Sequence, residues 1–287
     1  MPELPEVEVI RISLEKFIIN KKIKKVTIFN RNLRYKINSK IKEVARSQFV
    51  VSIKRKSKYL LIELSNNFII LFHLGMTGKI FIIEKNKVYK TSFYYENSHL
   101  KKHNHLALEF YNSTKLIYND VRKFGFIKLY KKDKIKKSSH LISLGPDALN
   151  KRFRSKYLFN KSKKVKKNIK NFLMDQKYIS GIGNIYANEI LHLSSINPRK
   201  ITSKLNYKTV SILNKNIKSV LKSSIRYGGS SIKDFSGISG KSGQYQQKFR
   251  VYNREGEKCK KTGCKGKVEK IYISNRSSFF CPKCQKY

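Results

Sequence analysis

The sequence predicts a multidomain α and β fold: an N-terminal helix with an antiparallel β-sandwich, then a mostly helical domain, then a small β-hairpin module. Short β-rich runs separated by turn or polar residues fill positions 25–130. After the basic stretch that begins at Lys131, apolar residues recur at helical spacing instead. All 4 cysteines lie from Cys259 onward. A chain of 287 residues has room for about two domains and a sizeable core.

The first predicted element is a helix that starts close to the N-terminus. Its apolar face consists of Val7, Ile10, Leu14, Phe17 and Ile18. Pro5 suits the first helical turn. Glu3, Glu6 and Glu8 suit the positive end of the helix dipole. We therefore expect this helix to hold Pro2 in place.

Pro2 itself has a possible chemical role. Removal of Met1 leaves Pro2 as a secondary amine at the N-terminus, with the Glu3 carboxylate beside it. An α-amino group has a pKa of about 8, against about 10.4 for lysine, so part of it is unprotonated near neutral pH. Such amines form Schiff bases, and a neighbouring acid or base assists them. On these residues alone, an ordinary second residue and a solvated glutamate remain the better interpretation.

The remaining elements follow in order along the chain. The β-rich runs are 25–29, 49–55, 59–64, 68–74, 79–83, 106–110 and 125–130. The clearest helix covers 207–227, and Gly228 and Gly229 end it. We expect a β-sandwich domain at 1–130, a basic linker at 131–149, a helical domain at 150–236, a mobile loop at 237–249 and a cysteine module at 250–287.

The charge of the chain favours a polyanionic partner. Lys and Arg number 64 and Asp and Glu 18, for a net charge of +46. AT-rich coding also enriches Lys, Ile and Asn, so the charge supports nucleic-acid binding without identifying a function. A membrane surface is the other polyanion, but no basic amphipathic helix with a clean apolar face stands out.

No targeting or membrane segment is evident. The chain opens with glutamates where a signal peptide has cations. The longest apolar run, 68–74, is interrupted by His73 and is far below the roughly 18 residues of a membrane span. We expect a cytoplasmic protein that is associated with the nucleoid when it is bound to DNA.

The cysteine spacing predicts a structural zinc site. The ligands are Cys259, Cys264, Cys281 and Cys284, which form two close pairs. The runs 268–274 and 277–280 between the pairs suit a β-hairpin. Four cysteines complete a tetrahedral site, so one Zn²⁺ would stabilise the fold of this module and would not be catalytic. Disulfides are a weak alternative without a secretory signal.

Motifs along the whole chain resemble one family, the formamidopyrimidine-DNA glycosylases, with the endonuclease VIII group as a near neighbour. Each motif is modest alone, but their joint order and spacing are specific. They are MPELPEVE (1–8), RKSKYLL (55–61), HLGMTG (73–78), VRKFG (121–125), LGPDAL (144–149), MDQKYISGIGNIYANE (174–189), GGSSIKDF (228–235) and NRSSFFCPKC (275–284).

The resemblance implies a bifunctional enzyme of base excision repair. Its substrate is an oxidised purine, such as 8-oxoguanine or a formamidopyrimidine, that is flipped out of the duplex. Pro2 would attack C1′ as the amine nucleophile, with Glu3 as acid/base, and two eliminations would then cut the strand. Lys58 would serve the first elimination and Arg276 the second, each at a phosphate. Without the resemblance, Lys58 is one solvated charge among many.

The resemblance also assigns residues that fill the hole left by the flipped base. These are Met76, Arg122 and Phe124, with Arg122 pairing with the orphaned cytosine. Met and Phe in β-hairpins are more often core residues, although glycines on both sides of Met76 suggest an exposed turn. The chain departs from the family with Val121 where Pro is usual and Lys123 where Arg is usual.

Further DNA contacts follow from the resemblance. Residues 181–184 (GIGN) open a helix of the family's helix–two-turn–helix domain, where Asn184 would grip the DNA backbone. His103 and Lys166, the latter placed in a basic helix, are the other phosphate contacts. The stretch 237–245 (GISGKSGQY) matches a loop that covers the everted base. A monomer acting on double-stranded DNA with oxidised bases or abasic sites is expected.

Two alternatives stay open. One is an endonuclease VIII-like glycosylase for oxidised pyrimidines; Leu4, Phe124 and the long loop before the cysteine module favour the purine enzyme. The other is a non-catalytic, zinc-containing nucleic-acid-binding relative. Against it, the chain keeps all four proposed catalytic residues, although a scaffold has no need of them: Pro2, Glu3, Lys58 and Arg276.

Overall fold

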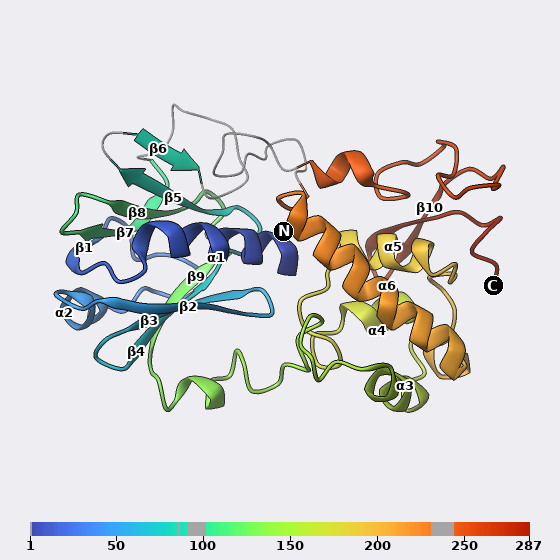
Figure 1. The fold of residues 1–287 in the computed structure, drawn as a ribbon, viewed down its shortest axis with the longest axis horizontal. Coiled ribbons are helices and arrows are strands. Elements are labelled where there is room, and N and C mark those ends of the chain that lie inside the picture. The colour runs from blue at the N-terminus through green and yellow to red at the C-terminus, as the bar shows by residue number, and fades with distance from the viewer. Residues whose placement is uncertain (1, 85–86, 91–101, 231–243) are drawn as a thin grey trace. The chain divides into compact units, whose positions relative to one another are not determined.

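The computed structural model describes residues 2–84, 87–90, 102–230 and 244–287, which divide into two compact units (Figure 1). The first unit joins Met1–Ile142 to Ile225–Gln246, and the second joins Ser143–Ser224 to Gln247–Tyr287. Of the loop expected at 237–249, residues 237–243 lie outside the described part.

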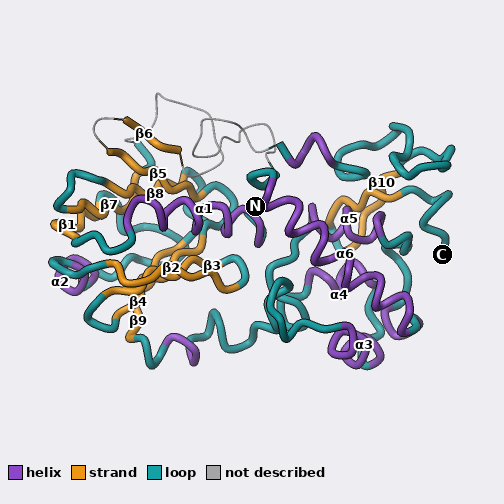
Figure 2. The backbone as a smooth tube through the Cα atoms, in the orientation of Figure 1, coloured by secondary structure: helices purple, strands orange, loops and turns teal. Residues whose placement is uncertain are grey.

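The first unit contains two antiparallel sheets, seen as the orange strands of Figure 2. The five-stranded sheet has the order β1-β7-β8-β5-β6, with bounds Ile23–Ile28, Asn104–Phe110, Lys115–Asp120, Gly78–Glu84 and Lys87–Lys90. The four-stranded sheet has the order β2-β3-β4-β9, with bounds Val50–Lys56, Tyr59–Leu64, Phe68–His73 and Phe126–Lys131. Every neighbouring pair in both sheets is antiparallel.

One apolar core joins both sheets to the N-terminal helix. Helix α1 runs over Leu4–Ile18 and the short α2 over Ile41–Ala45, and a 3-10 turn, η1, follows at Ile135–Lys137. Leu14 of α1, Ile62 of β3 and Leu108 of β7 are all fully buried in the same cluster. The apolar face of α1 therefore packs where the inner faces of the sheets meet, and the expected sandwich with an N-terminal helix is confirmed.

Two strands, β6 and β8, were not expected from the sequence. In β8 the apolar residues 116–118 run into Asn119 and Asp120, a polar pair that is typical of a turn. Both polar side chains are buried, and the Asn119 Nδ2 amide donates to Asn104 Oδ1 at 2.9 Å. Tertiary hydrogen bonds thus allow polar residues inside a central strand.

The second unit is helical and carries a terminal hairpin. Its helices are α3 (Ser155–Lys163), α4 (Ile169–Met174), α5 (Asn184–Leu193) and most of α6 (Tyr207–Arg226), with a 3-10 turn η2 at Thr202–Lys204. The hairpin consists of β10 (Glu269–Ile273) and β11 (Arg276–Phe280), and a further 3-10 turn, η3, covers Tyr245–Lys248. The mostly helical domain followed by a β-hairpin module is confirmed.

The expectation that Lys166 lies in a basic helix is wrong. Helix α3 ends at Lys163, and Lys166 lies exposed in the connection to α4. The chain starts a new helix because the Asn168 side chain accepts from the Asn171 N–H at 2.8 Å, which is an N-cap bond.

Candidate functional site

The N-terminus of the first unit is buried and capped. Pro2 is buried, and Glu3, the N-cap residue of α1, is only 2% exposed. The Glu3 backbone N–H donates to Glu6 Oε2 at 2.8 Å, and the two glutamates form a capping box. This reciprocal capping fixes the backbone that adjoins Pro2, so a nucleophile at this position would be held by α1.

Glu6 also ties α1 to the segment that follows α6. Its Oε1 atom accepts from both the backbone N–H and the hydroxyl of Ser230, each at 2.9 Å. Glu6 is 4% exposed, and such a carboxylate is stabilised by charge-assisted bonds of this kind. Ser230 directly precedes residues 231–243, which lie outside the described part of the chain. Glu6 therefore attaches the last described residue of the segment after α6 to the N-terminal helix.

Lys58 lies in the tight turn between β2 and β3. Its side chain is buried, with an exposed fraction of 7%, which does not fit a solvated surface charge. The turn has Ser57 in the left-handed region, at φ 57°. Arg55 braces it by donating to the Ser57 carbonyl at 2.9 Å and to Glu8 Oε2 of α1 at 2.7 Å. The turn that carries Lys58 is therefore braced against α1.

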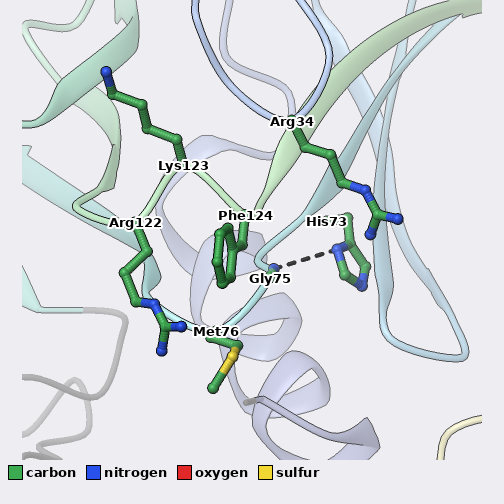
Figure 3. A pocket seen from close by; sticks show the side chains of 7 residues that line it. All are labelled: Arg34, His73, Gly75, Met76, Arg122, Lys123 and Phe124. Carbon is green, nitrogen blue, oxygen red and sulfur yellow. Dashed lines mark hydrogen bonds between the residues drawn. The ribbon is translucent and has the colours of Figure 1, made fainter.

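A hollow of about 560 Å³ opens beside this region (Figure 3). It is lined by Arg34, His73, Gly75, Met76, Arg122, Lys123 and Phe124. Figure 3 shows Met76 and Phe124 in the middle of this set, with Arg122 on one side and His73 with Arg34 on the other. The structure thus brings together the three residues expected to fill the hole left by a flipped base.

His73 and Arg34 belong to this hollow but were not expected as site residues. Burial, with the positive charges of Lys58 and Arg34, lowers the pKa of His73 to about 4, so its ring is neutral at pH 7. The Gly75 N–H donates to His73 Nδ1 at 3.3 Å, so the ring proton is on Nε2. A neutral N–H donor between two cations suits a phosphate oxygen. The available signal was the position of His73 at the start of the HLGMTG motif.

Met76 and Phe124 are exposed although they flank buried strands. Their exposed fractions are 39% and 46%, which contradicts the alternative that they are core residues. The Arg122 guanidinium lies over the Phe124 ring, 4.5 Å from its centroid, in a cation–π contact. Met76 lies in the β4–β5 turn and Phe124 in the β8–β9 loop, so two loops distant in sequence present one apolar pair.

The buried Asp120 side chain connects these two loops by hydrogen bonds. Its carboxylate is fully buried and accepts from the Thr77 hydroxyl at 2.5 Å and from the Gly125 N–H at 2.8 Å. Thr77 Oγ1 in turn accepts from the Arg122 N–H at 3.1 Å. At Gly75, with φ 60°, an added Cβ would lie 2.5 Å from the Gly125 backbone. The loops therefore touch backbone to backbone, and one buried carboxylate sets their spacing.

His103 adjoins the same loops but does not line the hollow. Its backbone carbonyl accepts from the Asp120 N–H at 3.0 Å, and its side chain is half-buried. The two residues that depart from the family pattern, Val121 and Lys123, lie in the loop between β8 and β9. Val121 is 47% exposed, and Lys123 has a φ of 57°. Lys123 therefore adopts a left-handed conformation that is uncommon for residues other than glycine.

In the second unit, Arg276 lies at the tip of the β10–β11 hairpin. It pairs with Ile273 across a turn whose residues, Ser274 and Asn275, have φ values of 47° and 58°. Left-handed residues at both turn positions are typical of tight two-residue hairpins. Arg276 is exposed, so its guanidinium is available to a partner.

A buried lysine anchors this hairpin close to its tip. Lys170 of α4 is fully buried, and its ammonium group donates to the Ser277 carbonyl at 2.8 Å and to Ser278 Oγ at 2.6 Å. Asn184 donates to the same Ser277 carbonyl at 3.1 Å. Asn184 therefore lies against the strand that begins at Arg276, and Lys170 is a positioning residue that the sequence reasoning missed.

One polar face of α5 docks the cysteine module. Asn184, Asn188 and His192 are spaced four residues apart and share this face. Asn188 Oδ1 accepts from the Phe279 N–H at 2.9 Å, and His192 Nε2 lies 3.2 Å from Cys259 Sγ. The same helix begins after Gly181 and Gly183, as expected for the GIGN stretch.

The four cysteine side chains form one compact cluster. The four sulfur atoms, from Cys259, Cys264, Cys281 and Cys284, all lie within 4.8 Å of one another. Cys259 and Cys284 are 3.8 Å apart, and Cys264 and Cys281 are 3.7 Å apart. A tetrahedron with metal–sulfur bonds of about 2.3 Å has edges of about 3.8 Å, so these residues fit a thiolate-bound metal ion. The same distances are far too long for a disulfide.

The helices show no membrane segment. Among the described residues, none is both long and apolar enough to cross a bilayer.

Comparisons with known proteins agree with this geometry. Residues 1–127 match the family model described as the formamidopyrimidine-DNA glycosylase N-terminal domain, and residues 144–236 match the formamidopyrimidine-DNA glycosylase H2TH domain. The formamidopyrimidine-DNA glycosylase of Rickettsia bellii is 37% identical over 286 residues, with 100% of both chains covered. That of Ruthia magnifica is 39% identical over 287 residues, with 99% of this chain and 100% of the relative covered.

Solved structures are similar over the whole length. The complex of Lactococcus lactis Fpg with DNA containing an abasic site has a TM-score of 0.86 at 33% identity, covering 99% of this chain and 100% of that one. A complex of a mutant of the same protein with Fapy-dG-containing DNA has a TM-score of 0.87 at 33% identity and covers 100% of both chains.

Proposed function

We propose that this chain, which belongs to the formamidopyrimidine-DNA glycosylase family and is a DNA glycosylase of base excision repair, removes oxidised purines from double-stranded DNA and then cleaves the strand. It would act as a monomer. The observation that carries the proposal is the buried and capped N-terminus, where Pro2 precedes the Glu3 N-cap of α1. A nucleophile must be held in one geometry to be effective, and this capping supplies that restraint.

The proposed reaction starts at the Pro2 amine. Its nitrogen forms a bond to C1′ of the damaged nucleoside while the C1′–N9 bond breaks, and Glu3 serves as the acid/base that assists departure of the base. Opening of the sugar ring then breaks the C1′–O4′ bond, O4′ takes up a proton, and the nitrogen lone pair forms an iminium ion at C1′. This iminium ion acidifies the C2′ proton. Loss of that proton breaks the bond to the 3′ phosphate oxygen, and a second elimination breaks the bond to the 5′ phosphate oxygen.

Two cations are proposed to serve the eliminations. Lys58, held in the β2–β3 turn, would donate a proton at the phosphate that leaves first. Arg276, at the hairpin tip, would bind the phosphate of the second elimination, for which a planar guanidinium is well suited.

DNA is proposed to contact both units. Met76 and Phe124 would enter the space left by the extruded nucleotide, and Arg122 would pair with the orphaned cytosine. The proposed phosphate contacts are His103, Lys166 and Asn184, to which the hollow adds His73 and Arg34.

We further propose that the metal of the cysteine cluster is one structural Zn²⁺. Cys259, Cys264, Cys281 and Cys284 would hold it as thiolates. When bound, the ion would cross-link a module that is too short to fold alone. The corresponding domain assignment is 1–130 for the catalytic sandwich, 131–149 for the linker, 150–236 for the helix–two-turn–helix domain, 237–249 for the lesion-capping loop and 250–287 for the zinc finger.

Borohydride trapping tests this function. The protein is incubated with a duplex that contains 8-oxoguanine opposite cytosine, and reduction should produce a protein–DNA cross-link that peptide mapping places on the N-terminal peptide. The cross-link should disappear when an extra residue precedes Pro2 or when Pro2→Gly is made. A chain with the same extra residue at its C-terminus is the matched control and should still be trapped.

The substrate series separates the alternatives. A duplex with an oxidised pyrimidine should be processed more slowly than the 8-oxoguanine duplex. The reverse order would favour an endonuclease VIII-like enzyme. The absence of a cross-link with every oxidised or abasic substrate would leave only a non-catalytic DNA-binding protein.

A further inference from the structure

His192 lies beside the cysteine cluster, on the last turn of α5. Its side chain is buried, with an exposed fraction of 1%. Its Nε2 atom is 3.2 Å from Cys259 Sγ and 3.9 Å from Cys284 Sγ. A histidine therefore faces two of the four clustered sulfur atoms, although the four cysteines already supply a complete ligand set.

The surroundings of the ring determine which nitrogen carries its proton. Among the described residues, His192 Nδ1 is buried and has no hydrogen-bond partner. Nε2 faces two sulfur atoms. A neutral imidazole has one N–H, and a buried N–H without an acceptor is costly. The proton is therefore on Nε2, directed at Cys259 and Cys284.

A thiolate-bound metal ion is a good acceptor for such a donor. Four thiolates around a divalent cation leave two negative charges in a partly buried site. N–H groups that point at the sulfur atoms stabilise that charge and orient the ligands. Cys259 already accepts from the Lys261 backbone N–H at 3.4 Å, so His192 provides a second donor to the same sulfur atom.

We propose that His192 is an outer donor of the metal site, which holds Cys259 and Cys284 as thiolates and slows release of the ion. The inference rests on the zinc assignment made above. His192 is a positioning residue here and not a fifth ligand, because the sulfur–sulfur distances of 3.7 and 3.8 Å already match a closed four-sulfur site. It also links the metal to α5, the helix that carries Asn184.

The test compares His192→Leu, which removes the donor, with His192→Gln, whose amide N–H reaches a similar position. Ile190→Val is the matched control, since Ile190 is a fully buried residue of the same helix with no contact to the cluster among those described. The purified full chain is analysed for zinc content. The rate of zinc transfer to a chromophoric chelator is then measured, and cobalt-substituted protein is examined by absorption spectroscopy.

We expect His192→Leu to bind zinc but to release it at least roughly tenfold faster, as is typical when an outer hydrogen bond to a metal ligand is lost. His192→Gln should restore most of the retention, and Ile190→Val should release zinc like the wild type. All four cobalt proteins should show the spectrum of a four-sulfur site.

Other outcomes overturn the inference. Equal release rates for His192→Leu and wild type would mean that the N–H does not stabilise the site. Equal acceleration in His192→Gln and His192→Leu would reduce His192 to a packing residue. A wild-type cobalt spectrum with nitrogen ligation would make it a ligand. Wild-type protein without zinc would instead refute the zinc assignment itself.

Discussion

A substitution at Asp120 tests how the β4–β5 turn and the β8–β9 loop hold the side chains of Met76 and Phe124 in place. Asp120→Asn keeps the shape of the side chain but removes its charge. The carboxylate accepts from Thr77 and from the Gly125 N–H. A hydrogen bond to a charged group contributes about 1.5–3 kcal/mol and a neutral one about 0.5–1.5 kcal/mol. The Tyr118 hydroxyl donates to the same carboxylate at 3.4 Å. With these bonds weakened and the desolvation cost of the charge removed, we expect a net loss of about 1–2 kcal/mol.

The loss should be local to the loops that carry Met76 and Phe124. Because the Gly125 N–H donates to this carboxylate, its amide hydrogen exchange should accelerate by roughly tenfold or more, since each 1.4 kcal/mol is a factor of ten. Thr77→Val should have a similar effect, because it leaves one carboxylate oxygen without its donor. In the double variant the two losses should overlap by about 1 kcal/mol, as is typical for residues in one network.

Single-turnover excision connects this network to function. Both variants should excise 8-oxoguanine more slowly than Ile80→Val, a variant of a fully buried core residue that should lose comparable stability without touching the loops. The reasoning is refuted if the two losses are additive, or if excision in Asp120→Asn is no slower than in Ile80→Val.

Three further outcomes are expected. Lys170→Met should slow the second elimination relative to the first by roughly tenfold, because it frees the strand that begins at Arg276. Gel analysis of the cleaved ends should show this change, whereas Lys166→Met should leave the ratio of the two elimination products unchanged. A hydrogen bond from Lys132, with further bonds from Ser52 and Lys54, lowers the pKa of Glu63 from 4.5 to about 2. Because the lysines are exposed, the ionised Glu63 contributes only about 1 kcal/mol to the free energy of unfolding; this contribution is present above pH 4.5 and is lost as the pH falls toward 2. Glu63→Gln should remove that part of the pH dependence of stability, as measured by urea unfolding. Lys58→Ala should reduce turnover far more than it changes the salt dependence of DNA binding, and an equal loss in both would reduce Lys58 to one more phosphate contact.

Much of the fold could be predicted from periodicity. The α1 and α6 helices and most strands were expected. Each buries one face, so apolar residues recur along it at the spacing of that face. Strand β8 was missed because Asn119 and Asp120 resemble a turn until their buried partners are known. Lys166 was placed in a helix because its basic neighbourhood gave no sign that Asn168 would cap a new one.

The candidate site, too, was predictable from the sequence only in part. Pro2 with Glu3, the spacing of the cysteines and the glycines around Met76 are visible in the sequence, since each depends on residues that are close together along the chain. His73, Lys170 and the polar face of α5 were not visible as a set. Their significance comes from partners between a few and about a hundred residues away.

By itself, the sequence determined which local elements form and which reactive residue types they carry. Only the tertiary structure decided that Asp120 would join the loops of Met76 and Phe124, and that Glu6 would bind Ser230. The physical reason is that apolar periodicity is a property of one segment. A buried carboxylate must instead find its donors wherever the fold brings them, and that choice is made by the packing of the whole unit.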